Sequence, residues 1–118
     1  MSGVLIVDDD EDIRVMLADL LTGEGYPVAT AGHGREAIAY LRSGKLPCII
    51  VLDLMMPVMN GWEFRAEQMK DPVFSSVPTV LFTGVADLAA EAKSLKATGY
   101  VTKSAHYHAV LDMVKRYC

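Results

Sequence analysis

The sequence is poor in cysteine, in basic residues and in long apolar runs, and each shortage argues against a class of protein. Its two cysteines, Cys48 in an apolar run and Cys118 at the last position, do not suggest a disulfide framework, and they suit a reducing compartment. Eleven lysines and arginines against fifteen aspartates and glutamates give a net charge of −4 without a basic cluster. Direct binding to nucleic acid is therefore not expected.

Long apolar segments are also missing. No run approaches the roughly 18 residues that a membrane-spanning helix needs, and no leader-like segment precedes the first apolar run. We therefore expect a cytoplasmic protein without a membrane partner. A chain of 118 residues can bury a sizeable core without the help of disulfides.

Five short apolar runs rich in valine and isoleucine alternate with helical patterns. The predicted strands cover residues 4–8, 27–31, 48–53, 78–83 and 100–102. Runs of this kind are typical of strands buried on both faces of a parallel sheet, and alternation with helices indicates an α/β fold. The prediction is one domain over residues 1–118 with a (βα)₅ doubly wound, flavodoxin-like fold and a five-stranded parallel sheet of order 2-1-3-4-5.

Apolar residues at helical spacing predict the inward faces of the five helices. In chain order these faces are Ile13, Met16, Leu17, Leu20 and Leu21; Ala37, Ile38 and Leu41; Trp62, Ala66 and Met69; Leu88, Ala92 and Leu95; and Tyr107, Val110, Leu111 and Val114. We expect the third helix to start near Asn60 and to fade before Pro72. Asp87 is the expected N-cap of the fourth.

Carboxylates follow two of the predicted strands. Asp8 and Asp9 close the first strand and Asp53 closes the third. These strands are neighbours in the predicted order, so their carboxyl ends share one crevice. Like charges brought together raise the energy unless a cation or a proton offsets them. A hard divalent cation such as Mg²⁺, which takes oxygen ligands, is the expected occupant.

A hydroxyl and an ammonium group follow the last two strands. Thr83 and Gly84 end the fourth strand, and Lys103 ends the fifth. A metal, a lysine, a hydroxyl and a nucleophilic carboxylate are together the groups that phosphoryl transfer uses. A single aspartate after a strand is more often the N-cap of a helix than a functional residue. We expect this ordinary role for Asp10 and Asp12.

The same residues resemble a known family, the receiver domains of two-component response regulators, in particular the single-domain type similar to chemotaxis regulators. The resemblance covers essentially the whole chain. It is carried by V-D-D at 7–9, D-L-M-M-P-V-M-N-G at 53–61, the pair Thr83-Gly84, and Y-V-T-K at 100–103. It implies a receiver domain without an output domain of its own.

The resemblance also implies a mechanism. A sensor histidine kinase or a histidine phosphotransfer protein would pass a phosphoryl group to the chain in a magnesium-dependent reaction. The chain would catalyse only its own phosphorylation and dephosphorylation, and would signal to a protein target through a changed face of the fourth helix, fifth strand and fifth helix. The implied roles are phosphoacceptor for Asp53; metal ligands Asp8, Asp9, Asp53 and the Met55 carbonyl; phosphate-binding lysine Lys103; and switch residues Thr83 and Tyr100.

The sequence departs from the family pattern at four places. Ser104 stands where proline usually follows the lysine, so we expect either a trans bond with a shifted loop or a strained cis bond. Lys96 stands where glycine is frequent, so a different cap is expected at the end of the fourth helix. Met55 and Val85 are apolar, and in the family these two positions flank the path of the water that attacks the phosphoryl group. Our hypothesis is therefore that the chain dephosphorylates itself slowly.

Two other functions are considered. A metal-dependent phosphohydrolase of the aspartyl-phosphate type usually has a second aspartate two residues after its nucleophile, and Met55 occupies that position. A receiver-like module that binds partners without phosphorylation would not need the complete set of acidic, hydroxyl and lysine residues. Tyr100 also has an alternative interpretation as an ordinary edge-strand aromatic.

Overall fold

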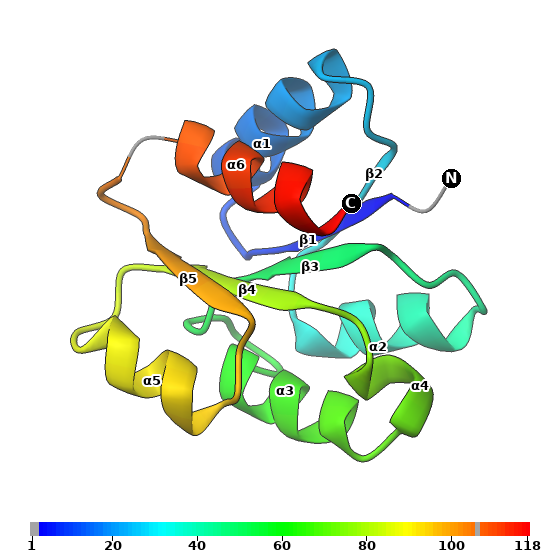
Figure 1. Ribbon diagram of the computed structural model, residues 1–118. Coiled ribbons are helices and arrows are strands. Elements are labelled where there is room, and N and C mark those ends of the chain that lie inside the picture. Colours follow the sequence, from blue (N-terminus) through cyan, green and yellow to red (C-terminus); the bar gives the residue numbers. More distant parts are fainter. Residues whose placement is uncertain (1–2, 106) are drawn as a thin grey trace.

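Five short apolar segments pair into one parallel sheet in a computed structural model that describes residues 3–105 and 107–118. The strand order is β2-β1-β3-β4-β5 (Figure 1). The strands are β1 (Val4–Val7), β2 (Val28–Ala31), β3 (Ile49–Leu52), β4 (Thr79–Thr83) and β5 (Gly99–Thr102). The predicted fold class, strand order and strand positions are confirmed.

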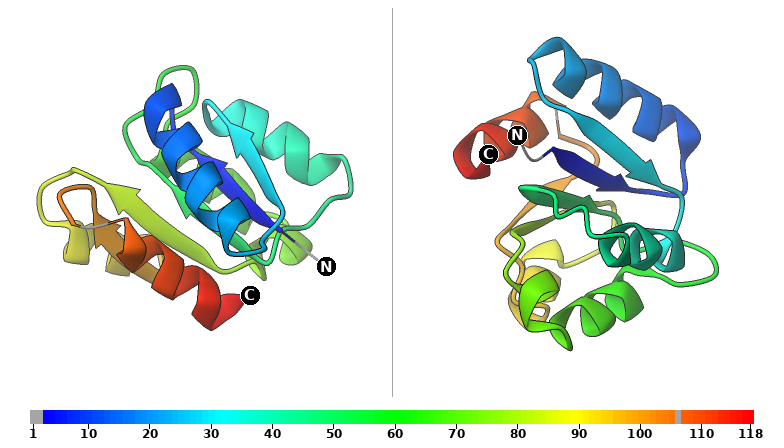
Figure 2. Two further views of the ribbon diagram at one scale, coloured as in Figure 1. Left: turned by 90° about the horizontal axis from the view of Figure 1, so that it is seen from above. Right: turned by 90° about the vertical axis from the view of Figure 1, so that its right-hand side faces the viewer.

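Helices cover both faces of the sheet. They are α1 (Glu11–Gly23), α2 (Gly34–Arg42), α3 (Gly61–Met69), α4 (Pro72–Ser75), α5 (Leu88–Ser94) and α6 (His108–Tyr117). Helices α1 and α6 lie on one face, and α2, α3 and α5 lie on the other (Figures 1 and 2). Within residues 3–105 and 107–118 no helix has the length and apolar character needed to cross a bilayer. The short α4, capped by Asp71, was not predicted.

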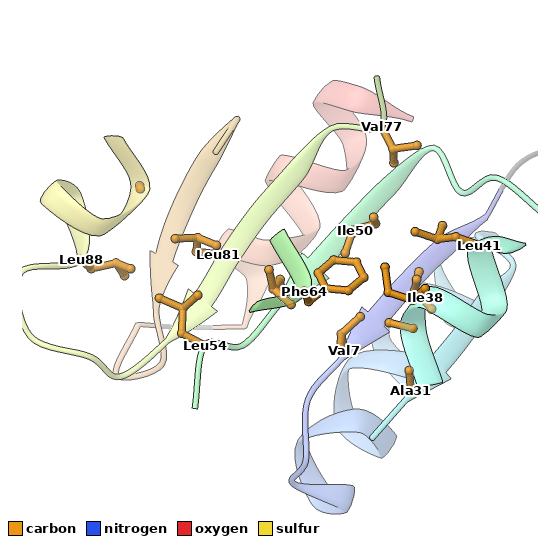
Figure 3. Close-up of a cluster of buried hydrophobic side chains, with 14 residues drawn as sticks. Val7, Ala31, Ile38, Leu41, Ile50, Leu54, Phe64, Val77, Leu81 and Leu88 are labelled. Atoms are coloured by element: carbon orange, nitrogen blue, oxygen red, sulfur yellow. The ribbon is translucent and has the colours of Figure 1, made fainter. Parts of the chain in front are cut away.

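The sheet divides the core into two apolar clusters, because successive strand residues point to opposite faces. In β1, Leu5 and Val7 join the cluster under α2, α3 and α5, whereas Val4 and Ile6 join the cluster under α1 and α6. Figure 3 shows the first cluster, in which Phe64 of α3 lies over the strands. Burial on both faces explains why the strands are continuous apolar runs.

The predicted inward face of α3 is wrong at two of its three residues. Trp62 is half-buried and packs against the core cluster, but Ala66 and Met69 are exposed. The buried side chains of this helix are Phe64, Arg65 and Gln68. Two polar residues can lie in the core here because their hydrogen-bonding groups find partners, so the buried face of α3 does not follow the apolar periodicity. Met16 of α1 was also predicted to face inward and is exposed.

Helix caps agree with the sequence in two places and differ in two others. Asp10 caps α1, and Asn60 forms a capping box with Glu63 at the start of α3. Asp87 occupies the N-cap position of α5, but it has φ 53° and makes no side-chain capping bond. Lys96 has φ 53°, the left-handed conformation that glycine favours at helix ends, so the expectation of a different cap is wrong.

The two cysteines form a disulfide bond, and the expectation that they are unpaired is wrong. Cys48 precedes β3 and Cys118 follows α6, and their Cα atoms lie 5.4 Å apart although 70 residues separate them in sequence. The fold brings the end of α6 to the start of the central strand, a proximity that has no local signal in the sequence. The pairing removes the cysteine-based argument for a reducing compartment.

We expect Cys118→Ser to lower the free energy of unfolding by roughly 2–4 kcal/mol, because the crosslink closes a long loop in the unfolded chain. The variant should still fold, since both apolar clusters stay intact. Urea unfolding of the wild type with and without a reductant measures the effect, and the variant should not respond to the reductant. Equal stability of oxidised and reduced wild type would contradict this prediction.

Candidate functional site

The ends of β1 and β3 bring the predicted carboxylates together. The strands pair in register up to Val7 and Leu52, and the backbone N–H of Asp53 donates to the carbonyl of Val7 (2.9 Å). Asp8 and Asp53, which follow these residues, are buried, with only 2% and 3% of their surfaces exposed. Asp9 is exposed beside them, and carboxylate oxygens of all three lie within 4.8 Å of one another.

Lys103 reaches this cluster from the loop after β5. Its Nζ lies 2.9 Å from Asp53 Oδ2 and 3.0 Å from Asp8 Oδ2. Its backbone N–H donates to the carbonyl of Thr83 (3.1 Å), which aligns the loop with the end of β4. The Lys103–Ser104 bond is trans, like every peptide bond of the described residues, so the cis alternative is wrong. The lysine meets both carboxylates without the proline that usually follows it.

Charge in the cluster is unbalanced. Burial, helped by the nearby charge of Asp53, raises the pKa of Asp8 despite hydrogen bonds from the backbone of Asp10 and from Lys103. Burial also acts to lower the pKa of Lys103, but hydrogen bonds to Asp53 and Asp8 and their charges outweigh it and raise the pKa. One ammonium group faces three carboxylates, and the excess negative charge suits a divalent cation.

Thr83 ends β4 next to the cluster. The side chain is fully buried, and its Oγ1 is the one buried side-chain polar atom, among the residues that the structure describes, without a hydrogen-bond partner. An unsatisfied buried hydroxyl normally destabilises a fold by about 1–3 kcal/mol, so an orphan at this position indicates a ligand that would bond to it.

Tyr100 does not join the cluster. It lies on β5, opposite Leu81 in the register, and its side chain is exposed. Over residues 3–105 and 107–118 it makes no side-chain hydrogen bond or ring contact with a site residue. The structure therefore brings together the side chains of Asp8, Asp9, Asp53 and Lys103. It places Thr83 at the end of the neighbouring strand β4 and leaves Tyr100 at the surface. The proposed metal ligand at Met55 is its backbone carbonyl, and its backbone N–H donates to Asp53 Oδ1 (3.3 Å).

Two further residues support the site. Gly61 begins α3 against the backbone of Asp53, where a Cβ atom would overlap the Asp53 carbonyl oxygen, so only glycine allows this approach. Arg14 of α1 donates from Nη1 to the carbonyl of Asp8 (2.7 Å) and holds the loop after β1. The sequence gives no signal for this role of Arg14, because a single arginine in a helical stretch is usually a solvated surface residue.

Val58 is a strained position in the loop that follows Asp53. It has φ 68°, and 70% of its surface is exposed. The left-handed conformation raises the energy of a residue with a Cβ atom by about 1–2 kcal/mol, and a β-branched side chain is a particularly poor match for it. The exposed side chain has little apolar burial to offset this strain.

We expect Val58→Gly to raise the free energy of unfolding by about 1 kcal/mol, after allowance for the greater freedom of glycine in the unfolded chain. Val73→Gly is the matched control, because Val73 is also exposed but lies in α4. The control should lower stability, since glycine disfavours a helix. Urea unfolding of both variants measures the difference, and a loss of stability in Val58→Gly would contradict the strain argument.

Comparisons with known proteins assign the chain to a family. A model described as "Response regulator receiver domain" matches residues 4–115. The chain is 38% identical over 102 residues, 85% of its length, to "Probable transcriptional regulator ycf27" of Guillardia theta. It spans only 39% of that relative. The chain therefore belongs to the response regulator receiver domain family.

Solved structures agree with this assignment. Chemotaxis protein CheY4 of Vibrio cholerae has a TM-score of 0.85 and 34% identity, over 100% of this chain and 99% of that one. Response regulator TrrA of Thermotoga maritima, in complex with Mg²⁺ and BeF, has a TM-score of 0.86 and 31% identity over the full length of both chains. The family and the class of function predicted from the motifs, a phosphorylation-activated signalling switch, are confirmed.

Proposed function

We propose that Asp53 is the phosphoacceptor of this switch and that it takes a phosphoryl group from a phosphohistidine on a sensor kinase or a phosphotransfer protein. The observation that carries the proposal is the setting of Asp53, a buried carboxylate that lies 2.9 Å from the Lys103 ammonium and beside two other carboxylates. The unpartnered hydroxyl of Thr83 belongs to the end of the neighbouring strand β4. A nucleophile, a cation and a hydrogen-bond donor converge there, as phosphoryl transfer requires.

The oxygen atoms of the site also suit Mg²⁺ as ligands. Asp8, Asp9 and Asp53 offer only oxygen atoms, at mutual distances within 4.8 Å, and the Met55 carbonyl is a fourth candidate ligand. Few carboxylates and several oxygen ligands are typical of magnesium sites. The magnesium complex of TrrA supports the assignment by similarity. Bound Mg²⁺ would neutralise negative charge on the reacting phosphoryl oxygens.

The chain's own residues then have separate tasks. An Asp53 oxygen attacks phosphorus, the bond to the donor imidazole nitrogen breaks, and the imidazole leaves with the bonding electron pair and takes up a proton. Lys103, which contacts Asp53 directly, would bond to a phosphoryl oxygen instead, and Thr83 would donate its hydroxyl to another. The product exchanges one carboxylate charge for a group with about two negative charges and three strong acceptors.

Thr83 and Tyr100 would couple phosphorylation of the site to a change at the surface. Movement of the Thr83 hydroxyl toward the phosphoryl group would leave space behind it, which the exposed Tyr100 ring could enter. This would bias the face formed by α5, β5 and α6, to which a partner protein would bind. Met55 and Val85 carry no group that could orient a water molecule, which supports a long-lived phosphoryl group and argues against a phosphohydrolase.

A cytoplasmic location and the absence of direct nucleic-acid and membrane contacts stay predictions. They depend on the charge and the hydropathy of the sequence. Receiver domains are signalling switches rather than conventional enzymes, and the limit of catalysis to the chain's own phosphorylation is part of the proposal.

Incubation with acetyl phosphate and Mg²⁺ should add one phosphoryl group to the chain, and Asp53→Ala should abolish the addition. Intact-mass spectrometry measures the product directly. Asp12→Ala is the matched control, because Asp12 is an exposed carboxylate in the first turn of α1, and it should behave like the wild type.

The wild type could be treated with several small phosphodonors and with a phosphorylated histidine phosphotransfer protein. If it stays unmodified, the result would favour a receiver-like module that acts without phosphorylation. Continuous release of phosphate from a free phosphomonoester would favour the phosphohydrolase. Modification that persists in Asp53→Ala would place the phosphoacceptor elsewhere.

Magnesium should stabilise the folded chain, by about 2.7 kcal/mol at one hundred times its dissociation constant, because it binds the native site and not the unfolded chain. Asp9→Asn should lose at least half of this stabilisation and leave the stability without metal nearly unchanged, since Asp9 is exposed. Thermal unfolding with and without MgCl₂ tests this, with Asp12→Asn as the control. Equal magnesium responses in both variants would remove Asp9 from the ligand set.

A further inference from the structure

Helix α3 holds helix α5 at two points. Trp62 donates its indole N–H to Glu91 Oε2 in the middle of α5 (2.8 Å). One turn further along α3, Arg65 donates from Nε to the carbonyl of Leu95 (3.0 Å) and from Nη2 to the carbonyl of Lys96 (2.8 Å). The two helices lie side by side on the same face of the sheet (Figure 1). Side chains from α3 therefore fix the middle and the C-terminal end of α5.

The arginine contact is a permanent anchor. Only 5% of Arg65 is exposed, and its Nη1 also donates to Gln68 Oε1 (2.8 Å) and to Thr79 Oγ1 (3.2 Å). Burial lowers the pKa of the guanidinium, and no carboxylate of the described residues forms an ion pair with it. Its charge is offset by oxygens at the C-terminal end of α5, where the helix dipole favours a cation. Breaking these bonds would leave several buried polar groups without hydrogen-bond partners.

Among the described residues, the N-terminal end of α5 is held by apolar packing alone. Leu88 and Ala92 are its buried residues and belong to the core cluster, whereas Asp87 gives no side-chain cap. Residues 84–87 connect that end directly to Thr83, whose hydroxyl has no partner. A shift of Thr83 would therefore reach the N-terminal end of α5 first, while the C-terminal end stays attached to Arg65.

The tryptophan contact lies between the end of α5 that Arg65 anchors and the end that only apolar packing holds. Trp62 and Glu91 are both half-buried, so water can replace either partner if the bond opens. The bond has a charged acceptor and is stronger than a neutral one, but its loss leaves no fully buried group unsatisfied. It is the contact of α3 with α5 that can break at low energetic cost.

We propose that Trp62 and Glu91 form a latch that is closed in the unphosphorylated chain and open in the phosphorylated one, with Arg65 as the pivot of α5. The proposal rests on the proposed function, since the latch sets the balance between the two states of the same switch. A contact made in only one of two states shifts their populations, whereas a contact made equally in both shifts nothing. Trp62 and Glu91 are thus positioning residues for the phosphorylation site.

Binding of beryllofluoride in the presence of Mg²⁺ is the first test, followed by isothermal titration calorimetry on the full chain. Glu91→Ala and Trp62→Phe should each bind the phosphoryl mimic about fivefold more tightly, the size expected for one partly exposed hydrogen bond. The double variant should match either single variant, because both remove the same bond. Lys93→Ala, an exposed substitution on the same helix, should bind like the wild type.

Hydrogen exchange without ligand is the second test. In Glu91→Ala the amides of residues 88–95 should exchange faster, while those of α3 and the strands keep their wild-type rates. Unchanged or weaker beryllofluoride binding in both single variants, or unchanged exchange in α5, would overturn the latch. A wild type that binds no beryllofluoride would overturn the proposed function instead, and the exchange result alone would then decide whether the latch exists.

Discussion

Asp8 and Asp53 lie side by side because β1 and β3 pair in register up to Val7 and Leu52, and both carboxylates are buried there. Two negative charges in one buried place repel each other, and the single ammonium of Lys103 offsets only part of this repulsion. The site therefore needs further positive charge. The proposed binding of a divalent cation follows from this imbalance, and so does the proposed exchange of the lysine contact for a phosphoryl group.

The surrounding structure keeps the two carboxylates in place. Gly61 lets α3 begin directly on the backbone of Asp53, and Arg14 holds the carbonyl of Asp8. Val58 accepts a strained conformation in the loop between Asp53 and α3. The local strain thus lies at the edge of the sheet that holds the proposed phosphorylation site, and burial in the two apolar clusters offsets it.

Helix α3 connects the site to the surface that would change. Its N-terminal end lies against Asp53, and its middle holds α5 through Trp62 and Arg65. Prediction from sequence failed for this helix, because its buried face contains Arg65 and Gln68 where an apolar stripe was expected. A buried arginine is stable only if several acceptors surround it, and two of the acceptors of Arg65 are carbonyls at the end of a helix some 30 residues further along the chain.

The sequence by itself determined the strands, their order, the acidic and lysine positions at one edge and the family, because apolar runs and motifs are local features. Only the tertiary structure decided that Asp8 is buried and Asp9 exposed, that Thr83 has no partner, that Cys48 meets Cys118, and that Trp62 meets Glu91. These facts depend on distances between residues far apart in the chain. Such distances are set by the packing of helices on the sheet, which local patterns do not encode.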